Sequence, residues 1–219
     1  MPDQATVHRI AVLGTGRVGT TLARAFARSG YEVIVGSRDP DALDEERRGQ
    51  LGEVAVAAFS EAVAGADVVV DALPGEHAVE VFSSLGDLLD GVVVLDVANP
   101  LDTSHGMPPT LLVKDTDSLA EQIQRACPRA RVVKSLNTVN AAVMVDPGSV
   151  GDGDTTVFVA GDDPAARELV ARLLTELGWR DVLDLGDLTA ARGIEMWLPL
   201  WVRLMQILGT AQFNLRIVR

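Results

Sequence analysis

Apolar residues in this chain fall in short continuous runs, separated by stretches that have the period of an amphipathic helix. Continuous apolar runs of four to seven residues are typical of parallel strands that are buried on both faces. We expect strands at Ile10–Leu13, Tyr31–Val35, Val54–Ala57, Asp67–Leu73, Val92–Val97, Arg131–Val133, Thr155–Ala160 and Asp181–Leu185.

The helical pattern lies between these runs. It predicts helices at Val18–Ser29, Ser60–Ala64, Glu76–Leu89, Asp117–Ala126 and Pro164–Leu177. Strands that alternate with helices predict an α/β fold, a doubly wound and mostly parallel Rossmann sheet. Right-handed crossovers would then bring all carboxyl ends of the strands to one edge.

A glycine motif opens the first helix. The first strand runs directly into Gly14, Thr15, Gly16, Arg17, Val18 and Gly19. In a dinucleotide-binding turn the glycines allow a tight bend, close approach of the backbone to a pyrophosphate, and close helix–strand packing. The helix N-terminus adds unpaired N–H groups that favour phosphate. The motif therefore predicts a dinucleotide site.

The end of the second strand indicates which dinucleotide. An NAD site usually carries Asp or Glu there, but this chain has Ser37 and Arg38. A guanidinium can bind a 2′-phosphate through paired, charge-assisted hydrogen bonds. We therefore expect NADP(H) as the cofactor. The alternative is that Arg38 is a solvated surface residue, followed by Asp39 as an ordinary turn residue.

Further polar loops follow the strands, at Leu73-Pro74, Asn99-Pro100 and Asn137-Thr138. They should meet the glycine motif and Ser37 at the carboxyl edge of the sheet, where open α/β sheets bind ligands. Asn137-Thr138 could instead be turn chemistry.

The C-terminal part has another character. Residues 189–212 read as a helix that is apolar over most of its circumference, with Pro199 as a kink or a new start. We expect residues 1–186 to form the nucleotide-binding Rossmann domain. Residues 187–219 should form a small helical segment that contacts a second subunit, in a homodimer, and the acceptor site.

Composition limits the possible partners. The chain has 219 residues and a net charge of −12, which argues against nucleic acid. The apolar stretch Ile194–Leu208 is too short and too polar to span a membrane, and no signal segment opens the chain. The single cysteine, Cys127, is expected to be a buried small residue and suits a reducing cytoplasm. No metal site is expected.

The chain resembles the NADPH:coenzyme F420 oxidoreductases, whose domain also forms the cytoplasmic part of the STEAP metalloreductases. The resemblance is carried by GTGRVGTTLA, VGSR, LPGEHAVE at 73–80, KSLNT at 134–138, AGDD at 160–163 and the ending DLGDLTAARGIEMWLPL. It implies hydride transfer between NADPH and F420 or another flavin-like acceptor, in a dimer.

The same resemblance assigns the site. Thr15–Val18 would line the pyrophosphate, Ser37 and Arg38 the 2′-phosphate, and the loops Leu73–Gly75, Asn99–Leu101 and Asn137–Ala141 the nicotinamide. The cofactor-binding residues expected are thus Gly14, Thr15, Gly16, Arg17, Val18, Gly19, Ser37, Arg38, Leu73, Pro74, Gly75, Asn99, Pro100, Leu101, Asn137, Thr138 and Ala141.

Two positions depart from the family pattern. The family often has a lysine four residues after the arginine of the 2′-phosphate site. This chain has Ala42 at that position, so Arg47 or Arg48 could substitute for the lysine. An aromatic residue can stand where this chain has Gly75, which would leave the acceptor pocket more open.

Proton donors are scarce. The one tyrosine, Tyr31, begins a strand, and the two lysines are Lys114 and Lys134. Reduction of an imine or ketone by NADPH needs a placed proton donor, whereas hydride transfer to a flavin-type ring needs mainly alignment. His77 could contact the acceptor or be a surface residue. A third hypothesis is an NADP(H)-sensing, regulatory module without turnover.

Overall fold

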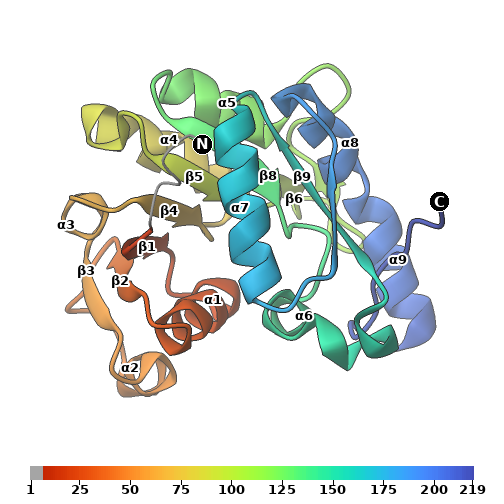
Figure 1. The fold of residues 1–219 in the computed structure, drawn as a ribbon, viewed down its shortest axis with the longest axis horizontal. Coiled ribbons are helices and arrows are strands. Elements are labelled where there is room, and N and C mark those ends of the chain that lie inside the picture. The colour runs from red at the N-terminus through yellow and green to blue at the C-terminus, as the bar shows by residue number, and fades with distance from the viewer. Residues whose placement is uncertain (1–6) are drawn as a thin grey trace, which may run out of the picture.

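The fold is an α/β sandwich built on one eight-stranded sheet, seen in a computed structural model that describes residues 7–219 (Figure 1). The strand order is β10-β9-β8-β5-β4-β1-β2-β3. The strands are β1 (Arg9–Leu13), β2 (Glu32–Ser37), β3 (Ala55–Ala58), β4 (Val68–Asp71), β5 (Val93–Asp96), β8 (Arg131–Ser135), β9 (Thr156–Gly161) and β10 (Asp181–Asp184). Residues 1–6, where we expect no signal segment, lie outside the described residues.

The order of strands reverses at β1, which pairs in parallel with both β2 and β4. The chain builds one half of the sheet outward through β2 and β3, and the other half through β4, β5 and β8. The doubly wound, mostly parallel sheet is therefore confirmed. The crevice above β1 is the place where such sheets bind ligands.

The expectation that all strands end at one edge is wrong for β9 and β10. β9 pairs antiparallel with β8, and β10 runs parallel to β9. The connection from β8 to β9 holds only the five-residue helix α6 (Ala141–Val145) and two 3₁₀ turns. Two parallel neighbouring strands are usually joined by a longer crossover helix, and this connection has none.

Two hydrophobic cores lie on the two faces of the sheet. On one face the core holds Leu22 and Phe26 of α1 (Arg17–Arg28), residues of α6, and Leu173 of α7 (Pro164–Glu176). The other core holds residues of α3 (Phe59–Val63), α4 (Gly75–Leu85) and α5 (Leu119–Ala126), among them Phe82. Cys127 is 3% exposed in this second core, as expected.

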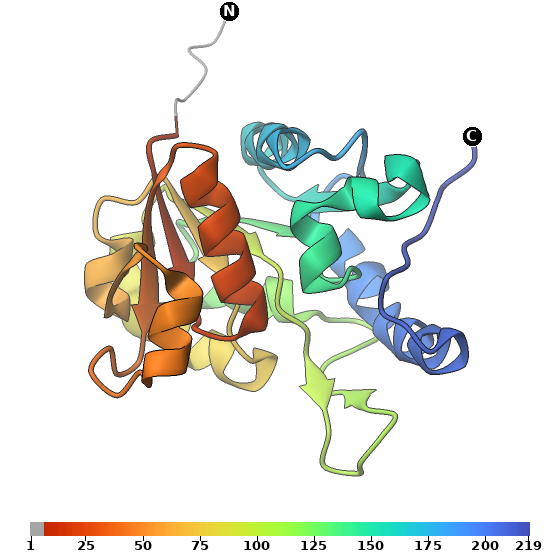
Figure 2. The same ribbon diagram turned by 90° about the horizontal axis from the view of Figure 1, so that it is seen from below.

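Three local features differ from the pattern-based expectation. α2 (Glu45–Leu51), which was not among the expected helices, is capped by Asp44, whose side chain accepts from the Arg47 amide. The hairpin β6 (Leu101–Asp102) and β7 (Thr110–Leu111), which was not among the expected strands, stands out from the body (Figure 2). The helix expected at Glu76–Leu89 is split, because α4 ends at Leu85. The next residue, Gly86, has a φ of +49° and begins a 3₁₀ turn that runs to Leu89.

The C-terminal helix is also split. A 3₁₀ turn (Leu188–Ala190) leads into α8 (Ala191–Met196) and then α9 (Leu198–Leu208), which starts next to Pro199 and ends at Gly209. Beyond α9 the tail returns to the sheet, where the Leu215 carbonyl accepts from the Thr156 amide at 2.8 Å. Within residues 7–219, none of the helices is long and apolar enough to cross a bilayer.

Candidate functional site

The turn between β1 and α1 is shaped by its glycines. Gly14 has a φ of +117°, and a Cβ there would lie 2.6 Å from the Ala72 carbonyl oxygen. A Cβ at Gly19 would lie 2.1 Å from the Gly14 carbonyl oxygen, so this glycine lets α1 pack on the turn. Gly16, in contrast, faces open space and leaves the start of α1 without a side-chain cap. The backbone N–H groups of the first turn are thus available to an anion.

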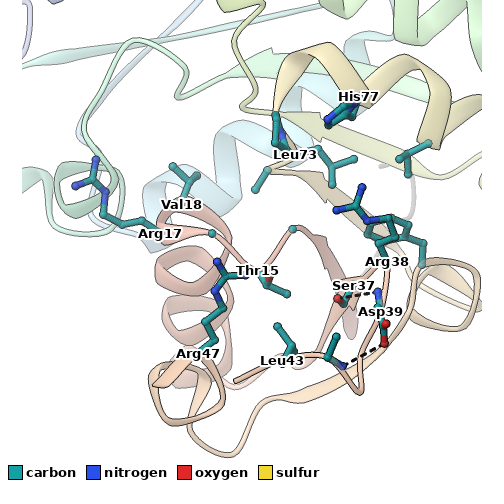
Figure 3. Close-up of a pocket in the computed structure, with 18 residues that line it drawn as sticks. Thr15, Arg17, Val18, Ser37, Arg38, Asp39, Leu43, Arg47, Leu73 and His77 are labelled. Atoms are coloured by element: carbon teal, nitrogen blue, oxygen red, sulfur yellow. Dashed lines mark hydrogen bonds between the residues drawn. The ribbon is translucent and has the colours of Figure 1, made fainter. Parts of the chain in front are cut away.

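A cavity of about 560 Å³ opens over this turn (Figure 3). Ten of the expected residues line it: Gly14, Thr15, Gly16, Arg17, Val18, Ser37, Arg38, Leu73, Pro74 and His77. The sequence argument missed Gly36, Leu43, Phe59, Ala72 and Val81. Of these, Phe59, Ala72 and Val81 follow the glycine motif by 40 residues or more, so only the fold brings them to it.

Other expected residues are outside the lining of this cavity: Gly19, Gly75, Asn99, Pro100, Leu101, Asn137, Thr138 and Ala141. Gly19 acts through packing. The others belong to the ends of β5 and β8 and to the start of α4 and α6, farther along the carboxyl edge. The structure therefore divides the predicted site into a cavity and an adjoining layer.

The end of β2 presents a cation to the cavity. The Ser37 hydroxyl oxygen accepts from the Asp39 amide at 3.3 Å, and Asp39 Oδ1 accepts from the amides of Asp41 and Ala42. Asp39 is therefore a turn residue as well as a lining residue. The Arg38 guanidinium lines the cavity without an ion pair to any described carboxylate.

Arg47 and Arg48 have different roles. Arg47 lines the cavity, and Figure 3 shows its side chain reaching from α2 toward Thr15. Arg48 donates from Nε to the Leu43 carbonyl at 3.1 Å and from Nη2 to the Pro40 carbonyl at 2.7 Å. Arg48 thus holds the loop before α2, and of the two arginines only Arg47 lines the cavity.

The cavity is locally positive on an acidic protein. Three arginines and one aspartate line it, whereas the whole chain carries a net charge of −12. Coulomb attraction over a few ångströms outweighs the field of distant, solvent-screened carboxylates. The cavity can therefore receive a ligand that carries phosphates.

His77 lies at the start of α4 and lines the cavity. Its side chain is 53% exposed, and its Nε2 lies 3.6 Å from the Glu76 carboxylate. The neighbouring Gly75 does not open the pocket as expected. A Cβ at Gly75 would lie 2.3 Å from the Asn99 carbonyl oxygen, so its role is the close approach of α4 to the loop after β5.

Two asparagines join the loops of the adjoining layer. Asn99 Nδ2 donates to the Asn137 carbonyl at 3.0 Å, and Asn137 Nδ2 donates to Asn99 Oδ1 at 2.9 Å. The residue between Ser135 and Asn137 is Leu136, whose φ of +59° makes the turn after β8 tight. Both asparagine amides are oriented by these bonds, because a backbone carbonyl can only accept.

A buried row of ionisable residues lies next to this layer. Asp71, Asp96 and Lys134 are paired across β4, β5 and β8, and each is fully buried. Burial, followed by the charge of Asp96, raises the pKa of the Asp71 carboxyl well above its ordinary value. The carboxylates of Asp96 and Glu195 outweigh the burial of Lys134 and raise its pKa, which keeps the ammonium charged.

The other candidate proton donors, Tyr31 and Lys114, lie outside the lining of the cavity. Tyr31 stands just before β2, at the opposite end of that strand from Ser37, and its hydroxyl donates to Glu176 at 2.5 Å. Burial and the Glu176 hydrogen bond raise the pKa of Tyr31 to about 12. Lys114 is exposed. In the part of the chain that is described, no group of three His, Cys, Asp or Glu side chains could hold a metal ion.

The reversal of strand order, the glycine turn and the phosphate-compatible cavity define the class: a dinucleotide-binding Rossmann protein. A family model described as "NADP oxidoreductase coenzyme F420-dependent" matches residues 9–100. The F420-dependent NADP reductase of Methanocaldococcus jannaschii is 30% identical over 207 residues, which cover 90% of this chain and 92% of that protein. The chain belongs to the family of F420-dependent NADP reductases, which are oxidoreductases.

Two further proteins are similar to this chain over most of its length. A solved protein of Arthrobacter sp. FB24, described as a candidate F420-dependent NADP-reductase, is 53% identical with a TM-score of 0.93 and covers 96% of this chain and 99% of its own. Metalloreductase STEAP3 of Rattus norvegicus is 31% identical over 199 residues, 88% of this chain and 38% of that longer protein.

Proposed function

We propose that this NADP-dependent oxidoreductase transfers a hydride between NADPH and coenzyme F420. One observation supports the cofactor half most directly: the Arg38 guanidinium lines the cavity at the end of β2, and no described carboxylate neutralises it. An acidic residue at that place would repel a 2′-phosphate, whereas an arginine can bind it in a bidentate manner.

The proposed placement of the cofactor follows the lining of the cavity. Gly14, Thr15, Gly16, Arg17 and Val18 hold the pyrophosphate on the N-terminus of α1. Ser37 and Arg38, assisted by Arg47, hold the 2′-phosphate. The bound nicotinamide supplies or accepts the hydride, and the protein supplies its orientation.

The nicotinamide end lies toward the loops after β4, β5 and β8. In this proposal Leu73 and Pro74 flank the ring and His77 contacts the acceptor, since all three line the cavity. The loops Asn99–Leu101 and Asn137–Ala141 close that end from the adjoining layer. Hydride transfer requires the two rings about 3–3.5 Å apart, so alignment by these loops is their main contribution.

Two observations favour a flavin-like acceptor over an imine or ketone. Lys134 is fully buried in an ion-paired row, and Tyr31 is bonded to Glu176 away from the cavity. Neither can serve as the proton donor that carbonyl or imine reduction needs. Among acceptors of the flavin type, membership in the family favours F420.

Stopped-flow mixing of the NADPH-loaded protein with F420, FMN or FAD tests the proposal. We expect the visible absorption of F420 to bleach in a single turnover, with FMN and FAD slower. Rapid transfer to FMN or FAD alone would contradict F420 as the acceptor. Tight NADPH binding without transfer to any of the three would favour a sensing module.

We also propose a homodimer in which a second copy covers α9. Leu200, Ile207 and Leu208 are 47%, 73% and 53% exposed on this helix. Apolar side chains clustered on one helix are typical of subunit contacts. The division into a nucleotide-binding domain (1–186) and a C-terminal segment (187–219) that contacts the partner and the acceptor stays part of this proposal. A stable monomer in sedimentation velocity at micromolar concentration would contradict it.

The buried Cys127 thiol, which donates to the Phe82 carbonyl at 3.1 Å, fits a protein that works in the reducing cytoplasm. We propose that location, with small-molecule redox partners only.

A further inference from the structure

We infer that Glu195 and Lys134 together form a positioning device: the C-terminal segment sets the geometry of the nicotinamide-end loops through a buried ion pair. The inference rests on the proposed function, because it concerns the loops that would align the two rings. It assigns to α8 a role in the site that does not depend on contact with any ligand.

Lys134 joins three parts of the molecule. Its Nζ donates to Asp96 Oδ2 at 2.9 Å, to the Ala98 carbonyl at 2.6 Å, and lies 3.0 Å from Glu195 Oε1. An ammonium has three N–H donors, and these three acceptors can take all of them. Lys134 therefore has no proton to offer to a substrate, and its bonds fix the backbone directly before Asn99.

Glu195 makes the second set of links. Its carboxylate is almost fully buried and accepts from the Leu119 amide at 2.8 Å and the Ala120 amide at 3.2 Å, at the start of α5. These amides are among the unpaired donors of a helix N-terminus, which favours a carboxylate. One side chain of α8 thus ties α5 to β8.

The asparagine pair lies next to these links. Lys134 is three residues before Asn137, and the Ala98 carbonyl that it holds precedes Asn99. The carbonyl of Ile194, the neighbour of Glu195, lies 3.4 Å from Asn137 Nδ2. Lys134 therefore holds the backbone before Asn99, and α8 contacts Asn137 directly; the hydrogen bonds between the two asparagines join these contacts. A shift of α8 would move both loops together.

Replacement of Glu195 by Gln tests this without leaving a buried charge unpaired, since Lys134 keeps Asp96 as its partner. The amide also retains an oxygen for one of the α5 donors. The matched control is Glu121→Gln. Glu121 accepts from Arg192 at 2.6 and 2.9 Å, so its loss removes another α8–α5 tie but leaves Lys134 untouched.

For Glu195→Gln we expect the rate of hydride transfer to fall by about tenfold or more, because small misplacements of reacting groups have such effects. The Kd of NADPH should change less than about twofold, since the phosphates bind at the other end. The isotope effect with 4-deuterated NADPH should rise toward its full value. In Glu121→Gln the rate of hydride transfer, the Kd of NADPH and the isotope effect should all stay near their wild-type values. Equal effects of both variants, or none in Glu195→Gln, would overturn the inference.

Hydrogen exchange separates this inference from the proposed function, because it needs neither turnover nor cofactor. In the ligand-free protein, Glu195→Gln should speed exchange at the amides of 97–99, 101 and 136–139, and Glu121→Gln should not. Unchanged exchange at both segments would overturn the positioning role even if F420 is reduced. Faster exchange in a protein that transfers no hydride would refute the proposed reaction alone.

Discussion

Asp71 and Asp96 are directly paired across the neighbouring parallel strands β4 and β5, and both carboxyls are fully buried. Two buried carboxylates so close to one another cannot both be charged at low cost. Lys134 contacts Asp96, not Asp71, at 2.9 Å, and Asp71 Oδ2 has no hydrogen-bond partner among the described residues. Burial raises the pKa of Asp71 well above its ordinary value, and, without the ammonium contact that Asp96 has, Asp71 is the member of the pair that keeps its proton to higher pH.

This relationship predicts that Asp71→Asn stabilises the protein increasingly as the pH rises. The folded-state pKa of Asp71 is raised above the ordinary 3.8, so its contribution is complete below that pH and is lost as the pH rises toward the folded-state pKa. Asparagine mimics the protonated form and avoids this loss. Urea unfolding at pH 4 and pH 8 measures the difference.

The exposed Asp41 supplies the control for that measurement, since Asp41→Asn should change the free energy of unfolding little at either pH. A variant Asp71→Asn that is less stable than wild type at pH 8, or equally shifted at both values, would show that Asp71 is charged in the folded protein.

The two glycines of the first turn should behave in opposite ways. Gly19→Ala places a Cβ 2.1 Å from the Gly14 carbonyl oxygen and should cost about 1–3 kcal/mol of stability. Gly16→Ala meets nothing within 4 Å and should cost less than about 1 kcal/mol.

Because Gly16 lines the cavity, the methyl group of Gly16→Ala should nevertheless weaken NADPH binding on the order of tenfold, about 1.4 kcal/mol. Thermal unfolding and fluorescence titration check both quantities. Unimpaired NADPH binding by Gly16→Ala would place the pyrophosphate elsewhere.

Arg47 and Arg48 form a second contrasting pair. Arg47→Ala should raise the Kd of NADPH several-fold and leave stability within about 0.5 kcal/mol, because it lines the cavity and is otherwise exposed. Arg48→Ala removes donors to the Leu43 and Pro40 carbonyls and should lower the melting temperature. A larger loss of NADPH affinity in Arg48→Ala than in Arg47→Ala would reverse their roles.

The first βαβ unit could be predicted from sequence because its signals are local. The apolar run before Gly14, the glycine spacing and the helix up to Arg28 all agree with the structure within about a residue. The direction of β9 could not be predicted in this way. An apolar run indicates a strand but not its direction, which here depends on a connection without a long helix.

The buried ion pair between Lys134 and Glu195 likewise could not be predicted from the sequence. Asp96, Lys134 and Glu195 are far apart along the chain and meet only because β5 pairs with β8 and α8 packs beside α5. At Gly75 the sequence led to a wrong prediction, because the absence of a side chain suggested a more open pocket. The structure shows that the Asn99 backbone occupies the place of the missing Cβ.

Arg38→Ala tests the phosphate assignment. Loss of charge-assisted hydrogen bonds should weaken NADPH binding by about 10- to 150-fold, equivalent to about 1.5–3 kcal/mol, and should leave NADH binding almost unchanged. Arg24→Ala is the control, because Arg24 is an exposed arginine of α1 outside the cavity lining. Equal losses for NADPH and NADH would discredit the phosphate role.

The central claim is that the cavity over the β1–α1 turn is a site for NADP(H) rather than NAD(H). Calorimetric titration of the wild-type protein with NADP⁺ and with NAD⁺, at equal ionic strength, tests it most directly. We predict saturable binding of NADP⁺, at least about tenfold tighter than that of NAD⁺. Equal affinity for both nucleotides, or no heat with NADP⁺, would contradict it.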